Sequence, residues 1–418
     1  MTQTRSDEQP QAQKQAACVA CSKAKRRCSK HLPACHRCLS KKLDCAYPVT
    51  VAMVSSSATS LTNGTARHDL STSDASLVSP LLPDGSLSLG GPPGPVTPRA
   101  ARLDLQNLWF LKFDSWQIDS DDLDDNRITY PDSGIDYFLG SIKKWLDQWT
   151  RENHCAFIHQ RLYGTNLPAP LQYAYATWLA YRASTGSANK KIAIDMALRW
   201  SRNLVQEQSI YQGIEDDALD LITHLSRTQT LFIFQMICLF DGDIRARSQA
   251  ETHSSTLVKW CDAAMRRAAI DVASGPSPSP GESINEPEIT QLRAHNTPAS
   301  TWKAWILSES IRRVWILATL TEAAFLIKKQ GFSMCPGSIG FTCRSGVWDS
   351  LCHQAWLACI QSESTVDIPR FCKGLYRLMD VAIPTDADEF ALVLLAYGKG
   401  KETLDEWLAF GRQEIAQY

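Results

Sequence analysis

The sequence predicts a small metal-binding domain of two short helices, a disordered linker and a large all-α domain, in that order along the chain. Three observations carry this prediction: six regularly spaced cysteines before residue 46, a segment of residues 51–100 without Phe, Trp or Tyr, and helical spacing of apolar residues from about residue 130. A chain of 418 residues, 44% of them apolar, can bury a sizeable core beside a small appended domain.

Charge and hydropathy indicate a basic N-terminal part, reduced cysteines and no membrane association. Residues 1–50 carry ten Lys and Arg against three Asp and Glu, a net charge of +7, which leaves −8 for the rest of a chain whose formal net charge is −1. Residues 1–17 are polar and lack the apolar segment of a secretory signal peptide, so we expect reduced cysteines. The most apolar run, Leu231–Phe240, is about half of the roughly 20 residues that a membrane span needs, so we expect no membrane partner.

The cysteine repeat predicts a cluster of two zinc ions. Two halves with the spacing Cys-x2-Cys-x6-Cys are separated by six residues, and their cysteines are Cys18, Cys21, Cys28, Cys35, Cys38 and Cys45. A structural zinc ion takes four tetrahedral ligands, so six thiolates saturate two ions only if two sulfur atoms bridge both. Each x6 spacing leaves room for a short helix. Three alternatives stay open: two Cys3His sites that use His31 and His36, a disulfide knot, and a zinc module that binds protein.

This pattern resembles the fungal Zn2Cys6 binuclear-cluster transcription factors. The resemblance covers Cys18 to Cys45 and includes Pro33 between the halves and the basic stretch at 22–27. It implies these ligand roles: two bridging cysteines, Cys18 and Cys35, and two terminal pairs, Cys21 with Cys28 and Cys38 with Cys45.

The same resemblance implies binding of double-stranded DNA. In the family a recognition helix follows the second cysteine and its end enters the major groove, where a lysine donates to guanine O6 and N7. Lys25 occupies the place of that lysine, which implies a CGG-type triplet as the target. The basic residues expected at DNA phosphates are Lys23, Arg26, Arg27, Lys41 and Lys42. The alternative is a solvated or nuclear-import basic run. Because Ser22 and Ala24 stand where many members carry Arg or Lys, we expect weak intrinsic affinity.

The resemblance further implies a nuclear transcription factor and, by analogy with the family, an activator of a fungal biosynthetic gene cluster, often for secondary metabolites. Residues 46–100 contain no sustained apolar heptads, so no coiled coil is predicted, and both a monomer and a homodimer stay open. A function of another class, a zinc-stabilised protein-binding adaptor or thiolate metal sensor, also stays open. The chain lacks the common catalytic motifs, so we expect no enzyme.

Composition predicts the domain boundaries. Between residues 51 and 100, 26 of 50 positions are Ser, Thr, Pro or Gly, which leaves little to bury against the entropy of ordering. The predicted parts are a disordered N-terminus at 1–17, the cluster domain at 18–48, a disordered linker at 49–100, an acidic-aromatic segment at 101–130 and the all-α domain at 131–418, with a disordered loop near 273–288. The acidic-aromatic segment suits an activation region that binds a coactivator, or a cap on the helical domain.

Apolar spacing of three to four residues predicts the helices of the all-α domain. The first follows the start signal at 131–133. The other expected helices are Leu171–Arg182, Lys190–Gln206, Ala218–Phe240, Leu257–Ile270, Thr301–Lys329, Trp348–Ile360 and Asp386–Tyr397. Alternating strands are scarce.

Local motifs between about residues 220 and 360 are similar to the central region of the same family. The matching segments are 227–229, 239–247, 302–315, 341–342 and the tryptophans at 348 and 356. We expect Glu309, Arg312 and Arg313 to form pairs along one helix while Trp305 and Trp315 face the core. This region is interpreted as scaffold, with a ligand-sensing pocket as the alternative. A further group, His154, Cys155 and His159, can meet on one helical face, but it lacks a fourth ligand and is interpreted as packing.

Overall fold

In the computed structural model the chain divides into two compact units, Met1–Gly94 and Pro95–Tyr418, and each is described here by itself. The structure describes residues 19–24, 26, 37, 38 and 41 of the first unit and 105, 108–119, 127–209, 219–274, 292, 297–362 and 374–415 of the second. The predicted disordered segments at 1–17 and 49–100 and most of the loop near 273–288 lie outside these residues.

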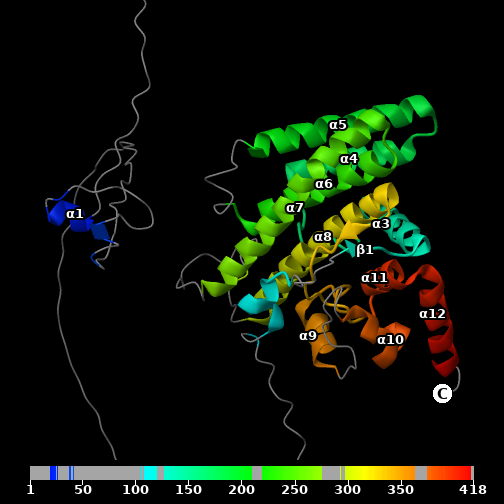
Figure 1. Cartoon of the computed structure of the whole chain (residues 1–418). Helices are drawn as coiled ribbons and strands as arrows, with labels where there is room; N and C mark the ends of the chain where they lie inside the picture. The colour runs from blue at the N-terminus through cyan, green and yellow to red at the C-terminus, as the bar shows by residue number, and fades with distance from the viewer. Residues whose placement is uncertain are drawn as a thin grey trace, which may run out of the picture. The chain divides into compact units, whose positions relative to one another are not determined.

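The second unit is built from α-helices, as the sequence predicts (Figure 1). Its helices are α3 (Asp132–Glu152), α4 (Ala169–Ala183), α5 (Ser187–Ser209), α6 (Leu221–Phe240), α7 (Ile244–Ala273), α8 (Pro298–Gln330), α9 (His353–Gln361), α10 (Leu378–Val381), α11 (Glu389–Lys399) and α12 (Lys401–Ile415). Among the described residues the only sheet pairs β1 (Arg127–Ile128) antiparallel to β2 (Ser333–Met334). No described helix combines the length and hydropathy that crossing a bilayer requires.

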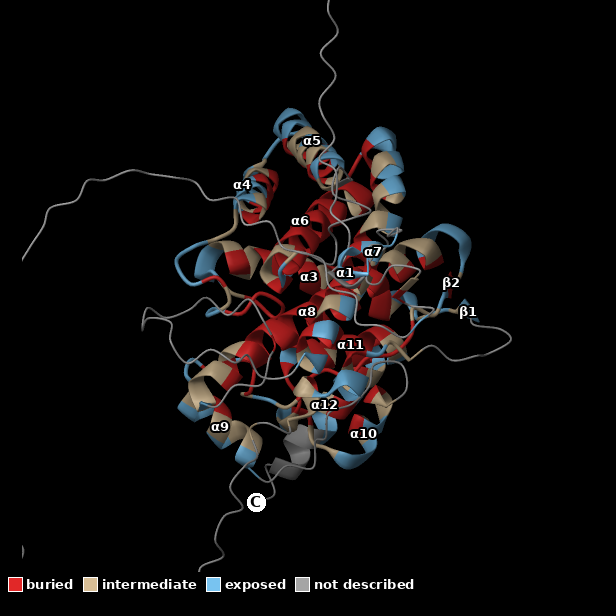
Figure 2. Ribbon diagram, turned by 90° about the vertical axis from the view of Figure 1, so that its left-hand side faces the viewer, coloured by how far each residue is buried: buried red, intermediate tan, exposed pale blue. Residues whose placement is uncertain are grey.

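Two long helices, α6 and α8, form the centre of the second unit. Figure 2 shows both buried along most of their length, whereas α5 has an exposed outer side. Each has a polar cap at its start. In α6 the Asp220 carboxylate accepts a hydrogen bond from the Thr223 backbone N–H (2.6 Å), and in α8 the Thr297 hydroxyl accepts one from the Ser300 backbone N–H (3.2 Å). Gly331, with φ of 88°, ends α8 in the left-handed conformation that glycine adopts without strain. Both helices therefore begin at a defined cap, and these caps are exposed at the edge of the buried core.

The other helices cover this centre in two groups. α4, α5 and α7 pack on α6, and α7 also packs on α8. On the other side α11 packs against α3 and α12, and α9 packs on α8. The approach of α3 to α11 depends on Gly134, because a Cβ atom there would lie 2.3 Å from the carbonyl oxygen of Ala396.

The helix bounds differ from the predicted ones by more than three residues at α7 and α9, and two helices, α10 and α12, were not predicted. α7 begins 13 residues earlier than expected, because the Asp243 carboxylate caps it and few residues of its polar first half are buried in an apolar pattern that would mark it in the sequence. α9 begins at His353 rather than Trp348, which belongs to the preceding turn. α12 was missed, although Leu404 and Trp407 are buried one turn apart on it.

Residues 108–119 of the acidic-aromatic segment pack on the helical body. They form two short 3-10 helices, η1 (Trp109–Leu111) and η2 (Phe113–Trp116), and the side chains of Phe110 and Trp116 are buried. The Arg312 guanidinium of α8 stacks on the rings of Trp109 (4.6 Å to the centroid) and Trp116 (3.9 Å) and donates to the carbonyl of Ser115 (2.7 Å). These contacts support the interpretation of this stretch as a cap on the helical domain.

Candidate metal centre and nucleic-acid interface

The first cysteine half contributes a helical turn with a buried sulfur. Helix α1 (Val19–Lys23) carries Cys21, whose side chain is fully buried. The backbone N–H of Arg26 donates to the carbonyl of Cys21 (3.0 Å), and this hydrogen bond keeps residue 26 close to the end of α1. A Cys-x2-Cys pair that opens such a turn presents its sulfur atoms on one side, as a shared metal ion requires.

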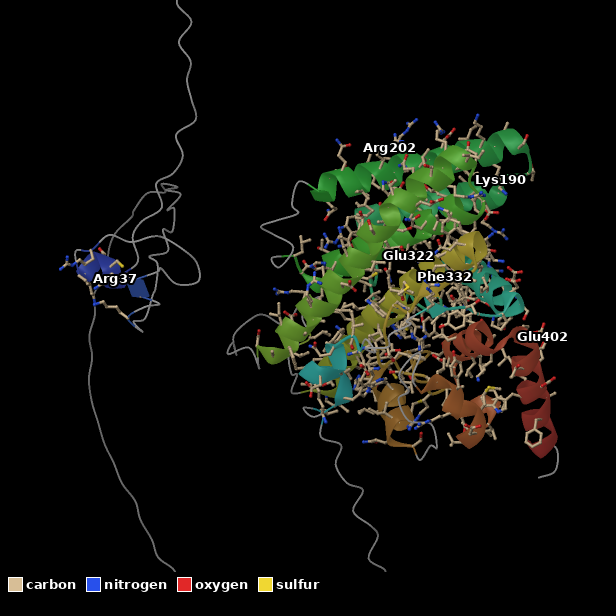
Figure 3. The ribbon with its side chains drawn as sticks, viewed as in Figure 1. Arg37, Lys190, Arg202, Glu322, Phe332 and Glu402 are labelled. Atoms are coloured by element: carbon tan, nitrogen blue, oxygen red, sulfur yellow. The ribbon has the colours of Figure 1, made fainter. Side chains whose placement is uncertain are left out.

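The second half repeats this arrangement around Cys38. This side chain is also fully buried, and the backbone N–H of Lys41 donates to the carbonyl of Arg37 (3.1 Å), which forms a second turn. The Arg37 guanidinium donates to the sulfur of Cys21 (3.8 Å), so the two halves contact each other (Figure 3). Neither cysteine forms a disulfide, and two buried cysteine sulfurs beside a cationic donor suit zinc.

Arg37 is a residue that the sequence interpretation missed. Its available signal was its position directly before Cys38, inside the second Cys-x2-Cys pair. A positive charge within hydrogen-bond reach of a metal-bound thiolate offsets part of the negative charge of the cluster. Arg37, from the second cysteine half, is therefore a candidate for stabilising the metal-bound sulfur of Cys21 in the first half.

Three of the predicted DNA-contacting side chains, those of Lys23, Arg26 and Lys41, are exposed. Exposed cations at the ends of two helical turns are available to phosphate oxygens. The remaining predicted site residues, Cys18, Cys28, Cys35, Cys45, Lys25, Arg27 and Lys42, lie outside the described residues.

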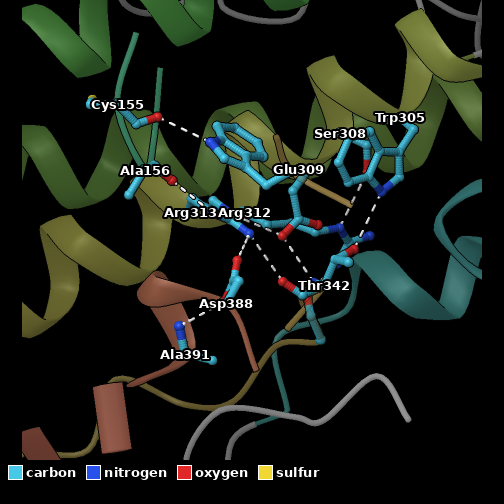
Figure 4. A network of polar contacts seen from close by, with 12 residues as sticks. Cys155, Ala156, Trp305, Ser308, Glu309, Arg312, Arg313, Thr342, Asp388 and Ala391 are labelled. Carbon is cyan, nitrogen blue, oxygen red and sulfur yellow. Dashed lines mark hydrogen bonds and ion pairs between the residues drawn. The ribbon is translucent and has the colours of Figure 1, made fainter. Parts of the chain in front are cut away.

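In the second unit the predicted polar motif forms a buried ionic network (Figure 4). Arg313 pairs with Glu309 one turn earlier (3.1 Å), as expected, and also with the carboxylate of Asp388. The Arg313 guanidinium donates to the carbonyls of Ala156 (2.8 Å) and Thr342 (3.1 Å) as well. One side chain thus joins α8 to three other segments of the chain.

The pKa shifts in this network are those of a buried ion pair that holds segments of the fold together. Burial raises the pKa of both Glu309 and Asp388, and the shared guanidinium opposes that rise. Burial works against the charge of Arg313, but the two carboxylates more than offset it and hold its pKa above the usual value. All three side chains are almost completely buried, so no substrate reaches them, and the scaffold interpretation of the motif holds.

The group at residues 154–159 does not form a metal site. Burial raises the pKa of the Cys155 thiol to about 12, and burial together with the nearby charge of Arg313 lowers the pKa of His159 to about 3. His159 lies among tryptophan rings, 5.1 Å from that of Trp348, and its Nδ1 accepts from the Arg161 backbone N–H (3.0 Å). Within the described part of the chain no three His, Cys, Asp or Glu side chains gather as metal ligands.

The segments at 227–229 and 239–247 also have structural roles. Arg227 lies over the Trp260 ring (4.8 Å), and Gln229 accepts from the Tyr163 hydroxyl (2.6 Å). Gly242 allows the tight connection from α6 to α7, because a Cβ atom there would lie 2.2 Å from the Cys238 carbonyl oxygen.

Known proteins are similar to this chain in two ways. The family model of the fungal Zn(2)-Cys(6) binuclear cluster domain matches residues 16–51. The chain is also similar to "Transcription factor gsfR2" from Penicillium aethiopicum, at 23% identity over 419 residues, which cover 94% of this chain and 94% of that protein. No solved structure matches the chain. Residues 16–51 are therefore a fungal Zn(2)-Cys(6) binuclear cluster domain, which binds two zinc ions.

Proposed function

We propose that the protein is a nuclear, zinc-dependent transcription factor that binds double-stranded DNA through residues 18–48. The observation that carries this proposal is the binuclear cluster domain at residues 16–51. A relative that is named a transcription factor and aligns with 94% of the chain supports it. We propose no enzymatic activity for the chain.

The zinc ions fold the domain that presents the DNA-contacting residues. Six cysteines would hold the two ions: Cys18 and Cys35 would be shared by both, Cys21 and Cys28 would complete one site, and Cys38 and Cys45 would complete the other. The full burial of Cys21 and Cys38, and the hydrogen bond from Arg37 to the sulfur of Cys21, support the role of these two cysteines as ligands. Zinc supplies the tetrahedral centre around which a peptide too short for its own hydrophobic core can fold.

Base reading is assigned to Lys25, which donates to the guanine O6 and N7 atoms of a CGG-type triplet. The phosphate contacts are assigned to Lys23, Arg26, Arg27, Lys41 and Lys42. The exposure of Lys23, Arg26 and Lys41 supports this role, because phosphate contacts need accessible cations on the protein surface.

The regulatory role is proposed as activation of a fungal biosynthetic gene cluster. It rests on analogy with the family that the cysteine pattern indicates. Mapping the occupied promoters in the native host, with transcript levels in a deletion strain, tests it. Occupied promoters of adjacent biosynthetic genes and reduced transcripts are expected, whereas raised transcripts would indicate a repressor.

Two lysine variants of the full-length, zinc-loaded chain test DNA reading. Lys25→Ala should bind CGG-containing and scrambled duplexes equally, because the base contact is lost. The matched control Lys41→Ala should keep the preference for the CGG-containing duplex. It should make the negative slope of log affinity against log salt shallower by about 0.9, because one phosphate contact is lost.

A Lys25→Ala variant that discriminates as well as the unmodified protein would contradict the base-reading assignment. Equal binding of both duplexes by the unmodified zinc-loaded protein would instead favour the protein-binding adaptor. Titration by fluorescence anisotropy at several salt concentrations distinguishes these outcomes.

A further inference from the structure

The second unit contains a cavity of about 440 Å³ whose lining includes none of the residues of the Arg313 network. One face of α8 lines it through Trp315, Glu322 and Leu326, which follow one another at intervals of seven and four residues. α7 contributes Asp262, and β2 contributes Met334 at the edge of the cavity. The volume is in the range of pockets that hold small organic ligands.

The cavity joins apolar walls to two acidic side chains. Asp262 and Glu322 both line it, and none of the described residues around it is Lys, Arg or His. The walls are formed by the indole of Trp315 and by aliphatic side chains such as that of Leu326. The described lining therefore contains two acidic side chains and no basic one.

Glu322 is the less satisfied of the two carboxylates. It is half-buried, and no hydrogen bond or ion pair joins it to another described residue. Figure 3 shows it in the middle of the helical body. Burial raises the pKa of Glu322, which means that the charged form lacks the solvation it has in water. A cation beside this carboxylate would restore that stabilisation.

Asp262, in contrast, is held in place by the cavity wall. Its carboxylate accepts a hydrogen bond from the Trp315 indole N–H (3.0 Å), and this contact fixes both the acid and the ring. The neighbouring Thr319 hydroxyl is occupied by the carbonyls of Trp315 and Ile316 (2.9 and 3.1 Å). Two other neutral polar side chains of the lining, Gln330 and Ser333, also donate to backbone carbonyls, so the aromatic ring and the acids are the features left for a ligand.

These features select the chemical class of the ligand. A metal ion would need more ligands, and the described residues contain no group of three or more His, Cys, Asp or Glu side chains that could hold one. An anion would face two carboxylates. An organic cation can pair with the acids and cover the indole and aliphatic walls with its apolar body.

We propose that this cavity binds a small organic cation, a protonated amine on an apolar body, which pairs with Glu322 and Asp262 and packs against Trp315. Met334, whose side chain is 55% exposed at the edge, supplies a flexible apolar side chain that can cover amines of different shapes.

The test is calorimetric titration of the full-length chain, without DNA, with matched probes. Tryptamine and 2-phenylethylamine carry the cation, whereas tryptophol and 2-phenylethanol are neutral isosteres, and phenylacetate is an anion. We expect the amines to bind with one-to-one stoichiometry and the alcohols to bind at least tenfold more weakly, because a hydrogen bond to a charged group is worth about a factor of ten or more. Phenylacetate should not bind.

Three variants locate the site. Glu322→Gln and Asp262→Asn should each weaken amine binding about tenfold or more and leave alcohol binding unchanged. Glu406→Gln removes an exposed carboxylate from α12 and should change neither. Circular dichroism checks that each variant is folded, and Asp262→Asn keeps an oxygen acceptor for the Trp315 indole.

Equal affinities for amine and alcohol, unchanged amine binding in both pocket variants, or no amine binding at millimolar concentration would each overturn the proposal. Because DNA is absent from the titration, its result does not depend on the function proposed for residues 18–48.

Discussion

Two consecutive arginines on α8 have different roles that follow from their directions around the helix. Arg312 stacks on Trp109 and Trp116 and so holds the segment before the helical domain, whereas Arg313 turns into the core and meets two carboxylates. A step of about 100° along a helix is enough to separate a stacking contact from an ionic one. Lysine at either position would lose the planar donors that both contacts use.

The first prediction concerns Asp388, which caps α11 and pairs with Arg313. Asp388→Asn keeps the cap on the Ala391 backbone N–H but removes the charge, so we expect a loss of about 3 kcal/mol in the free energy of unfolding. The control Asp220→Asn changes the exposed cap of α6 and should cost at most about 0.5 kcal/mol. Urea unfolding followed by tryptophan fluorescence measures both, because all 13 Trp residues lie in the second unit. Equal losses would show that the charge of Asp388 is unimportant.

The second prediction is a pH dependence caused by His159. Its pKa is lowered to about 3 by burial and by Arg313, against an ordinary value of 6.5. Below pH 6.5 the unfolded chain therefore binds a proton that the folded chain does not, so stability falls as the pH drops from 6.5 toward 3. Between pH 7 and pH 5 this loss is about 2 kcal/mol.

The variant His159→Gln should remove that part of the pH dependence, because glutamine keeps an acceptor for the Arg161 N–H but does not titrate. The measurement compares the free energy of unfolding at pH 7 and pH 5 in both proteins. An identical pH dependence in the variant would disprove the assignment.

At the scale of elements, the packing of α3 depends on which side of the helix a glycine faces. Gly134 lies against the backbone of α11, whereas a Cβ atom at Gly140 would meet no atom within 4 Å. The same residue type on one helix therefore marks a close helix contact at one position and an open site at the other. Close approach of two backbones excludes a side chain at the contact.

The third prediction uses this pair. Gly134→Ala should destabilise the second unit by about 1–3 kcal/mol, because the added methyl group forces α3 and α11 apart. Gly140→Ala should stabilise it by about 0.5–1 kcal/mol, because alanine loses less conformational entropy in a helix. Thermal unfolding of the two variants should show shifts of opposite sign. Shifts of the same sign would contradict the close contact between α3 and α11.

At the scale of the whole molecule, the chain joins two units that depend on different sources of stability. The first contains the zinc cluster domain, and the second has a continuous apolar core that includes most of the tryptophans. Removal of zinc should unfold the first unit, and denaturants that weaken apolar burial should unfold the second, so we expect the two units to lose their structure independently.

The fourth prediction follows from this division. A chelator should abolish DNA binding and leave the tryptophan-detected unfolding of the second unit unchanged. Cys21→Ser and Cys38→Ser should each lower the zinc content below two ions per chain, whereas Cys352→Ser, at an exposed thiol of the helical body, should keep two. Native mass spectrometry counts the ions. Zinc loss from the Cys352 variant, or destabilisation of the second unit by the chelator, would contradict the separation.

The sequence alone determined the features that depend on neighbours along the chain. The cysteine spacing predicted the binuclear cluster, because each half of the ligand set is a short Cys-x2-Cys-x6-Cys repeat that can be recognised along the chain, and apolar periodicity predicted most helices of the body. Tertiary structure decided which distant groups meet. The partner of Arg313, 75 residues away, and the cavity at Glu322 were beyond the sequence, since both depend on helices that pack side by side without any local pattern to mark the contact.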